Sequence, residues 1–108
     1  MKKTFTLFFA ILGVSISSIA QTTFNDDFES YTVGSKLGPQ SINWTTWSGA
    51  DGGTEDVNVV SNDAKSGTKS IYFNSTSTTG GPADVVLPFG GVYNTGTFKF
   101  TSWFKVPT

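Results

Sequence analysis

The chain has 108 residues and a formal net charge of −1, with seven lysines, eight Asp and Glu residues, and no cysteine, histidine or arginine. This composition excludes disulfide bonds, nucleophilic systems that use Cys or His, and His-ligated zinc. It also argues against nucleic acid as a partner, because phosphate binding needs a clustered positive face.

The first twenty residues have the pattern of a secretory signal peptide. Two lysines follow Met1, and an uncharged, mostly apolar segment then leads to the small residues Ser18 and Ala20. Its apolar part is shorter than the roughly 20 residues that a membrane span needs. We predict cleavage after Ala20, which gives a secreted or cell-surface chain of residues 21–108 with no membrane insertion and a formal charge of −3.

The rest of the chain has the composition of an all-β protein. Thr, Ser, Gly, Asn, Val and Phe are frequent, whereas the good helix formers Ala, Leu, Glu and Arg are scarce. Alternating apolar residues between Gly, Pro and Asn turns predict strands at residues 23–29, 43–48, 56–60, 68–74, 84–89 and 97–106. Strands at this spacing predict a β-sandwich or a barrel, and we expect an antiparallel β-sandwich.

The first predicted strand mixes carboxylates with aromatic rings. Asp27 and Glu29 would share one face, and their backbone spacing is compatible with the paired carboxylates of a glycosidase. The alternative is that the acidic side chains of this segment are solvated or cap a turn.

Two tryptophans lie three residues apart in the second predicted strand. Trp44 and Trp47 would point to opposite faces, so we expect one in the core and the other outside it. The Gly-rich loop that follows contains Asp51, Glu55 and Asp56. It lacks the spacing of a calcium-binding loop, and we interpret its carboxylates as solvated.

The last predicted strand has the clearest alternation. Phe98, Phe100, Phe104 and Val106 would line one face, while the other face is polar except for Trp103. A half-buried strand of this kind needs neighbours on both edges. We therefore expect an incomplete N-terminal portion of a sandwich that continues into further modules; the alternative is a complete six-stranded domain.

Four motifs carry a family resemblance: NDDFESYTVGSKLG, the W-x-x-W segment with its Gly-rich loop, SGTKSIYF, and the final G-x-x-N-T-G-T-F-x-F strand. Together they resemble the first half of a concanavalin A-like or laminin-G-like jelly roll. More narrowly, they resemble modules of surface proteins that Gram-negative bacteria export by the type IX route, which end in a C-terminal sorting domain. The resemblance implies a jelly-roll module across residues 21–108.

The resemblance also implies a structural Ca²⁺ that ties the first strand to a later turn. The side chain of Glu29 would be one ligand, with backbone carbonyls from the turn around Lys65 and Gly67. A further acidic ligand would come from outside this chain.

Exposed aromatic rings can stack on sugars, and we predict Trp47, Tyr72, Tyr93 and Trp103 as ligand-binding residues, with packed rings as the alternative. The predicted function is a secreted, non-catalytic binding or adhesion module for a glycan or cell-surface ligand. The alternatives are part of a polysaccharide-degrading enzyme, although the chain lacks the Glu-x-Asp-x-x-Glu strand of jelly-roll glucanases, or a structural spacer without a ligand.

Overall fold

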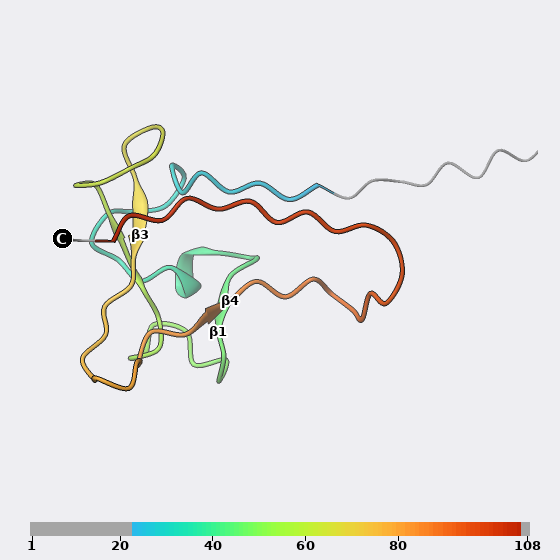
Figure 1. Cartoon of the computed structure of the whole chain (residues 1–108). Helices are drawn as coiled ribbons and strands as arrows, with labels where there is room; N and C mark the ends of the chain where they lie inside the picture. The colour runs from blue at the N-terminus through green and yellow to red at the C-terminus, as the bar shows by residue number, and fades with distance from the viewer. Residues whose placement is uncertain (1–22, 107–108) are drawn as a thin grey trace, which may run out of the picture.

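The computed structural model describes residues 23–106, and the predicted signal peptide lies outside this part of the chain (Figure 1). Short strands form two separate sheets, in each of which two strands pair antiparallel. One sheet joins β1 (Thr45–Thr46) to β4 (Val85–Val86), and the other joins β2 (Asn58–Val60) to β3 (Ser70–Tyr72). One 3₁₀ turn, η1 (Gly38–Gln40), precedes β1. The described residues are therefore non-helical apart from this turn and are compatible with an all-β class.

Four of the six predicted strands contain an observed strand, although each is shorter than predicted. In the larger sheet, Asn58 lies opposite Tyr72 and Val59 opposite Ile71. The polar turn at residues 61–67 joins these two antiparallel strands, as its composition predicts. Within residues 23–106, no helix is long and apolar enough to cross a membrane.

The prediction of a strand at residues 23–29 is wrong. The side chain of Asp26 accepts a hydrogen bond from the amide of Phe28 at 2.9 Å, and the side chain of Asp27 accepts one from the amide of Glu29 at 3.1 Å. Phe28 has a φ of 63°, which is left-handed backbone. Local carboxylate-to-amide bonds of this kind stabilise turns in competition with strand pairing, so they end the extended segment early.

The prediction of a half-buried, paired strand at residues 97–106 is also wrong for the described residues. The segment is extended, but no strand pairs with it. Its apolar side chains are exposed rather than half buried. The alternation predicts how the segment would pair, whereas pairing itself requires a neighbouring strand, which residues 23–106 do not supply.

A small core lies between the two sheets. Tyr31, Leu37, Val57 and Val59 are buried, and Trp44 is among the partly buried side chains that pack against them. Trp47, in contrast, is 76% exposed. The expectation that one of the two tryptophans is in the core and the other outside is confirmed.

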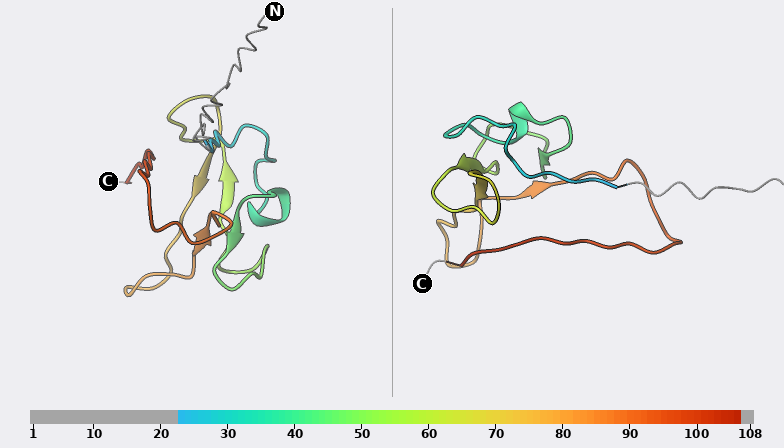
Figure 2. Two further views of the ribbon diagram at one scale, coloured as in Figure 1. Left: turned by 90° about the vertical axis from the view of Figure 1, so that its right-hand side faces the viewer. Right: turned by 90° about the horizontal axis from the view of Figure 1, so that it is seen from above.

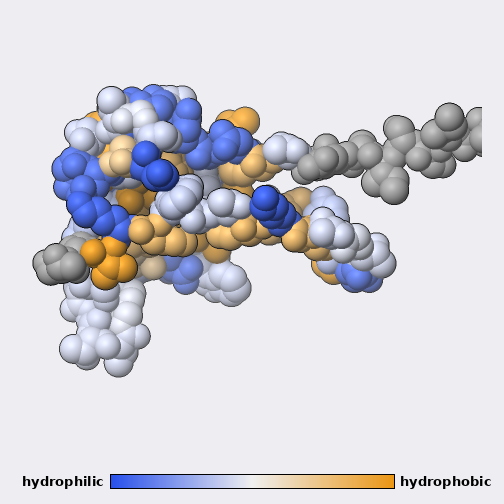
Figure 3. Space-filling model, turned by 45° about the horizontal axis from the view of Figure 1, so that its top comes forward, coloured by the Kyte–Doolittle hydropathy of each residue, from blue (hydrophilic) through white to orange (hydrophobic). Residues whose placement is uncertain are grey.

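Residues 87–106, here called the arm, extend from the body of the protein as a long open loop and return to it (Figures 1 and 2). Near the tip, the rings of Tyr93 and Phe98 meet edge to face at 5.9 Å, and the hydroxyl of Tyr93 donates to the carbonyl of Phe89 at 2.9 Å. Hydrophobic side chains follow the arm along its length (Figure 3).

Candidate functional site

A small hollow of about 170 Å³ lies beside the β2–β3 sheet. Tyr72 and Asn58 line it as directly opposed residues of the two strands, which places their side chains on the same face. Asn74 and Thr76 follow β3 and add an amide and a hydroxyl to the lining. Tyr72 is 47% exposed, so part of its ring is available to a ligand.

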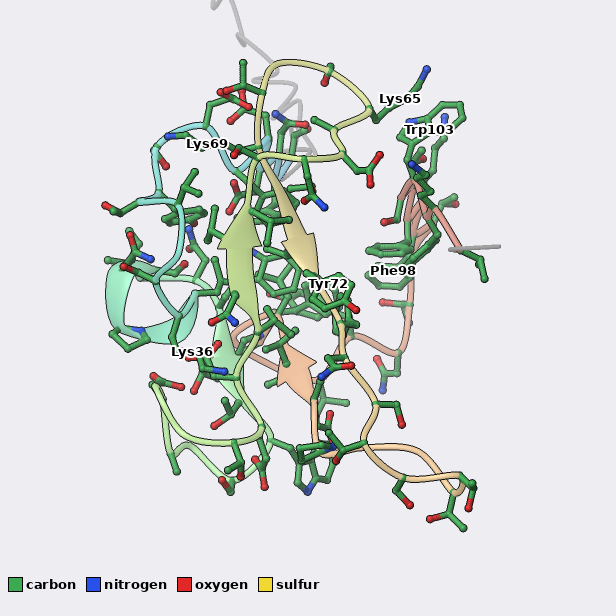
Figure 4. All side chains as sticks on the ribbon, turned by 90° about the vertical axis from the view of Figure 1, so that its left-hand side faces the viewer. Lys36, Lys65, Lys69, Tyr72, Phe98 and Trp103 are labelled. Atoms are coloured by element: carbon green, nitrogen blue, oxygen red, sulfur yellow. The ribbon has the colours of Figure 1, made fainter. Side chains whose placement is uncertain are left out.

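Lys36 lies at the other side of this hollow. Its backbone bridges to Asn58, and its ammonium donates to the carbonyl of Asp56 at 2.7 Å. In Figure 4, Lys36 and Tyr72 lie on opposite sides of the β2–β3 pair. The hollow therefore combines an aromatic ring with amide, hydroxyl and ammonium groups, which are the groups that bind polyhydroxylated ligands.

Trp47 belongs to a different, shallow surface that shares no lining residue with the Tyr72 hollow. Its neighbours there include Thr45 in β1 and the segment Val86, Leu87 and Pro88. The amide of Trp47 donates to the carbonyl of Asp84 at 3.0 Å, which fixes the backbone while the ring stays exposed.

Tyr93 and Trp103 both lie on the arm. The ring of Tyr93 already contacts Phe98, as described above. The ammonium of Lys65 lies 4.4 Å from the centroid of the Trp103 ring, and the two side chains lie side by side in Figure 4. The structure therefore distributes the predicted ligand-binding residues over the hollow, the Trp47 surface and the arm.

Glu29 fastens the N-terminal segment to the start of β3. Its carboxylate accepts hydrogen bonds from the amides of Thr68 and Lys69, both at 2.7 Å, and from the hydroxyl of Thr68 at 2.9 Å. In return, the ammonium of Lys69 donates to the carbonyls of Glu29 and Tyr31 at 2.8 and 2.7 Å. We call Glu29, Thr68 and Lys69 the clamp.

The clamp also stabilises the charge of Glu29. The amide of Thr68, then the amide of Lys69 and the Thr68 hydroxyl, hold the pKa of the Glu29 carboxyl below its ordinary value of 4.5. The carboxylate of Asp27 accepts a hydrogen bond from the backbone amide of Glu29. Both carboxylates that the glycosidase hypothesis would use thus accept hydrogen bonds from the protein itself.

The predicted calcium ligands meet in part. Gly67, with a φ of +67°, lies against the Glu29 carboxylate, which brings the predicted turn next to the predicted side-chain ligand. The oxygens of Glu29 already accept three hydrogen bonds, and the Lys69 ammonium occupies the nearby carbonyls. Within residues 23–106, no group of three or more Asp, Glu, His or Cys side chains surrounds a possible metal position. The groups that surround the Glu29 carboxylate are thus hydrogen-bond donors, N–H and O–H. Calcium binding at Glu29 stays a prediction.

The interpretation of the Gly-rich acidic loop as solvated is wrong for Asp56, which is only 2% exposed. Its carboxylate accepts the amides of Gly38, Gly52 and Val57 at 2.8 to 3.2 Å. A side chain at Gly38 would collide with this carboxylate, since a Cβ there would lie 2.8 Å from an Asp56 oxygen. No local pattern in the sequence marked this burial, because the donor Gly38 comes from η1, outside the loop.

A second carboxylate that sequence reasoning missed is Asp26. It accepts hydrogen bonds from the hydroxyl of Tyr31 at 2.7 Å and from the indole N–H of Trp44 at 2.9 Å. Burial, together with the bond to Asp26, raises the pKa of the Tyr31 hydroxyl. Asp26 thus supplies the polar partner that two partly buried aromatic rings require.

Comparisons with known proteins give no relative for this chain. No protein-family model matches it, and neither a curated protein nor a solved structure does so. The site is therefore interpreted from its own geometry.

Proposed function

We propose that the chain is a secreted, non-catalytic binding or adhesion module that recognises a glycan or glycan-bearing surface through the Tyr72 hollow. The observation that carries this proposal is the pairing of Tyr72 with Asn58 across two hydrogen-bonded strands, at the edge of a hollow. An aromatic face beside fixed amides offers stacking to a sugar ring and hydrogen bonds to its hydroxyls.

The electrostatics of the hollow are compatible with a neutral sugar. The Lys36 ammonium is engaged by the carbonyl of Asp56, and the Asp56 carboxylate is buried against backbone amides. The groups left for a ligand are the amides of Asn58 and Asn74, the hydroxyl of Thr76 and the ring of Tyr72. Such groups bind hydroxyls without requiring a charge on the ligand.

The same proposal includes the fold family and the location. We take the chain as the N-terminal portion of a concanavalin A-like or laminin-G-like jelly roll in a type IX-exported surface protein, with a cleaved signal peptide at residues 1–20. Support comes from the quoted motifs and from the two antiparallel strand pairs. The strands that would complete a sandwich come from outside residues 23–106.

Binding is tested by isothermal titration of residues 21–108 against a panel of neutral and acidic oligosaccharides. Tyr72→Ala removes the ring from the hollow, and we expect affinity to fall about tenfold, whereas Tyr72→Phe keeps the ring and most of the affinity. Trp47→Ala is the matched control, because this exposed ring lines a separate surface and its loss leaves the hollow unchanged.

The outcomes separate the alternative functions. Sugar binding that survives Tyr72→Ala but is lost with Trp47→Ala or Trp103→Ala would place the binding site at that tryptophan. It would contradict the proposal that the Tyr72 hollow binds the sugar. The absence of binding to the whole panel favours a structural spacer. Release of reducing sugar from any polysaccharide, abolished by Glu29→Gln, favours the enzyme.

A further inference from the structure

The returning leg of the arm, residues 97–106, leaves a row of large apolar side chains uncovered. Phe98, Phe100 and Phe104 are 65%, 75% and 78% exposed, and Trp103 on the alternate side is 71% exposed. In the described part of the chain, no other segment forms backbone hydrogen bonds with this leg. Both its backbone edge and its apolar face are therefore open to a partner strand.

The leg is nevertheless held in place at both ends. Near the tip, Phe98 packs against Tyr93, and at the base Trp103 lies under the Lys65 ammonium at 4.4 Å. Lys105 forms an ion pair with Asp63 in the loop between β2 and β3. These contacts present the leg as an extended strand.

The exposed side-chain area of the leg, summed over both of its faces, approaches the area that a dimer interface uses. Burying a Phe or Trp side chain removes about 150–250 Å², so the four rings at their observed exposure offer roughly 400–700 Å². Phe89, Val92 and Tyr93 near the tip, which are 67%, 95% and 60% exposed, add to this surface. A standard interface buries about 800 Å² per partner.

We infer that residues 97–106 pair with the same segment of a second copy of the chain, as antiparallel strands around a two-fold axis. Such an interface is self-complementary and closes after two copies. In an antiparallel pair around a two-fold axis, residues opposite each other must point to the same face. Two registers therefore pair nine of the ten residues of the segment: in one Thr101 lies opposite its own copy, and in the other Ser102 does.

The charges distinguish these two registers. The register centred on Ser102 places Lys99 opposite Lys105 of the second copy, and like charges directly opposite each other are destabilising. The register centred on Thr101 instead places Lys99 opposite Trp103, which gives a cation–π contact in each half of the dimer. Both registers form an aromatic pair in each half, Phe98 with Phe104 in this register and Phe100 with Phe104 in the other, so the lysine contacts decide between them.

Single cysteines test this register, since the chain contains none of its own. In the Thr101 register, two Thr101→Cys residues lie directly opposite, at about 4.5–5.5 Å between Cα atoms, which is within disulfide range. Ser102→Cys residues lie diagonally, at about 7–8 Å, which is beyond that range. We expect Thr101→Cys to form disulfide-linked dimers at least tenfold faster. Equal rates, or faster Ser102→Cys linkage, overturn the assignment.

Sedimentation velocity of residues 21–108 tests the dimer itself. We expect a concentration-dependent monomer–dimer equilibrium whose dissociation constant rises at least about tenfold in Phe104→Glu. The matched control is Ile42→Glu, because Ile42 is 99% exposed and lies outside the arm. Lys99→Glu weakens the dimer in the Thr101 register and strengthens it in the Ser102 register.

Three results overturn the inference. One is a monomer at every concentration up to about 1 mM, as expected if a neighbouring module of the same polypeptide covers the leg instead. Another is open-ended aggregation, and the third is a dimer that Phe104→Glu leaves intact. None of these results bears on sugar binding at Tyr72, so the dimer and the proposed function can fail separately.

Discussion

Glu29 and Lys69 each bind the backbone of the other. The Glu29 carboxylate accepts the Lys69 amide at 2.7 Å, while the Lys69 ammonium donates to the Glu29 carbonyl at 2.8 Å. This reciprocal contact joins segments 40 residues apart in the sequence and holds the N-terminal segment against the start of β3. The acidity of the first predicted strand thus serves the fold.

The clamp makes stability depend on pH. Because the pKa of Glu29 is lowered in the folded state, its contribution is complete above the ordinary value of 4.5 and is lost as the pH falls through the lower folded pKa. We expect the melting midpoint of Glu29→Gln to lie below that of the wild type near pH 6, with a difference between the two midpoints that narrows as the pH falls below 4.5. Glu55 also has a lowered pKa, because its carboxylate accepts the Ser48 amide. Since Glu55 is present in both proteins, its contribution cancels in the difference between their melting midpoints. A gap that is constant with pH would contradict this role.

Gly67 is required beside the clamp for two reasons that can be separated. Its φ is +67°, and a Cβ there would lie 2.5 Å from an oxygen of Glu29. Gly34 has a φ of +84°, but a Cβ at that residue would meet nothing within 4 Å, so Gly34→Ala measures the backbone cost alone, about 1 kcal/mol. We expect Gly67→Ala to lower the free energy of unfolding by more than Gly34→Ala does in urea titrations. Equal losses of unfolding free energy in the two variants would show that the Glu29 carboxylate moves away from the added Cβ without cost.

The calcium prediction is tested by thermal melting of residues 21–108 with excess Ca²⁺ and with a chelator. If Ca²⁺ binds at Glu29, chelation lowers the midpoint, and Glu29→Gln removes that difference. If the hydrogen bonds alone hold the segment, Glu29→Gln lowers the midpoint by the same amount in both buffers. A chelator effect that persists in Glu29→Gln would place a metal elsewhere.

Local patterns located all four observed strands, including β1 and β4, whose pairing joins distant parts of the sequence. The alternation at Val57 and Val59 and the polar turn that follows lie within a few residues of each other, so β2 and β3 could be found from the sequence. The clamp could not, because the bond between Glu29 and Thr68 spans 39 residues and no periodicity marks it. The segment at residues 97–106 has the strongest alternation yet lacks a partner among the described residues.

The candidate site was predictable only in part for the same reason. Tyr72 was identifiable as an aromatic residue in a strand, whereas its neighbour Asn58 is set by the register of β2 against β3. Asp56 was misinterpreted, because a carboxylate in a Gly-rich segment has the same composition whether it is solvated or surrounded by backbone amides. Which of these applies depends on how η1 and the loop fold over it.

The buried Asp56 carboxylate gives the largest expected loss of stability. Asp56→Ala leaves the amides of Gly38, Gly52 and Val57 without their acceptor, and we expect the free energy of unfolding to fall by about 3–5 kcal/mol. Asp56→Asn retains one acceptor oxygen and should lose less. The control is Asp51→Ala, whose exposed carboxylate accepts from the Thr45 hydroxyl at 2.8 Å and from the Thr46 amide at 3.0 Å, with an expected loss of about 1–2 kcal/mol. If urea unfolding followed by tryptophan fluorescence gives equal losses for the two alanine variants, Asp56 does not organise the loop.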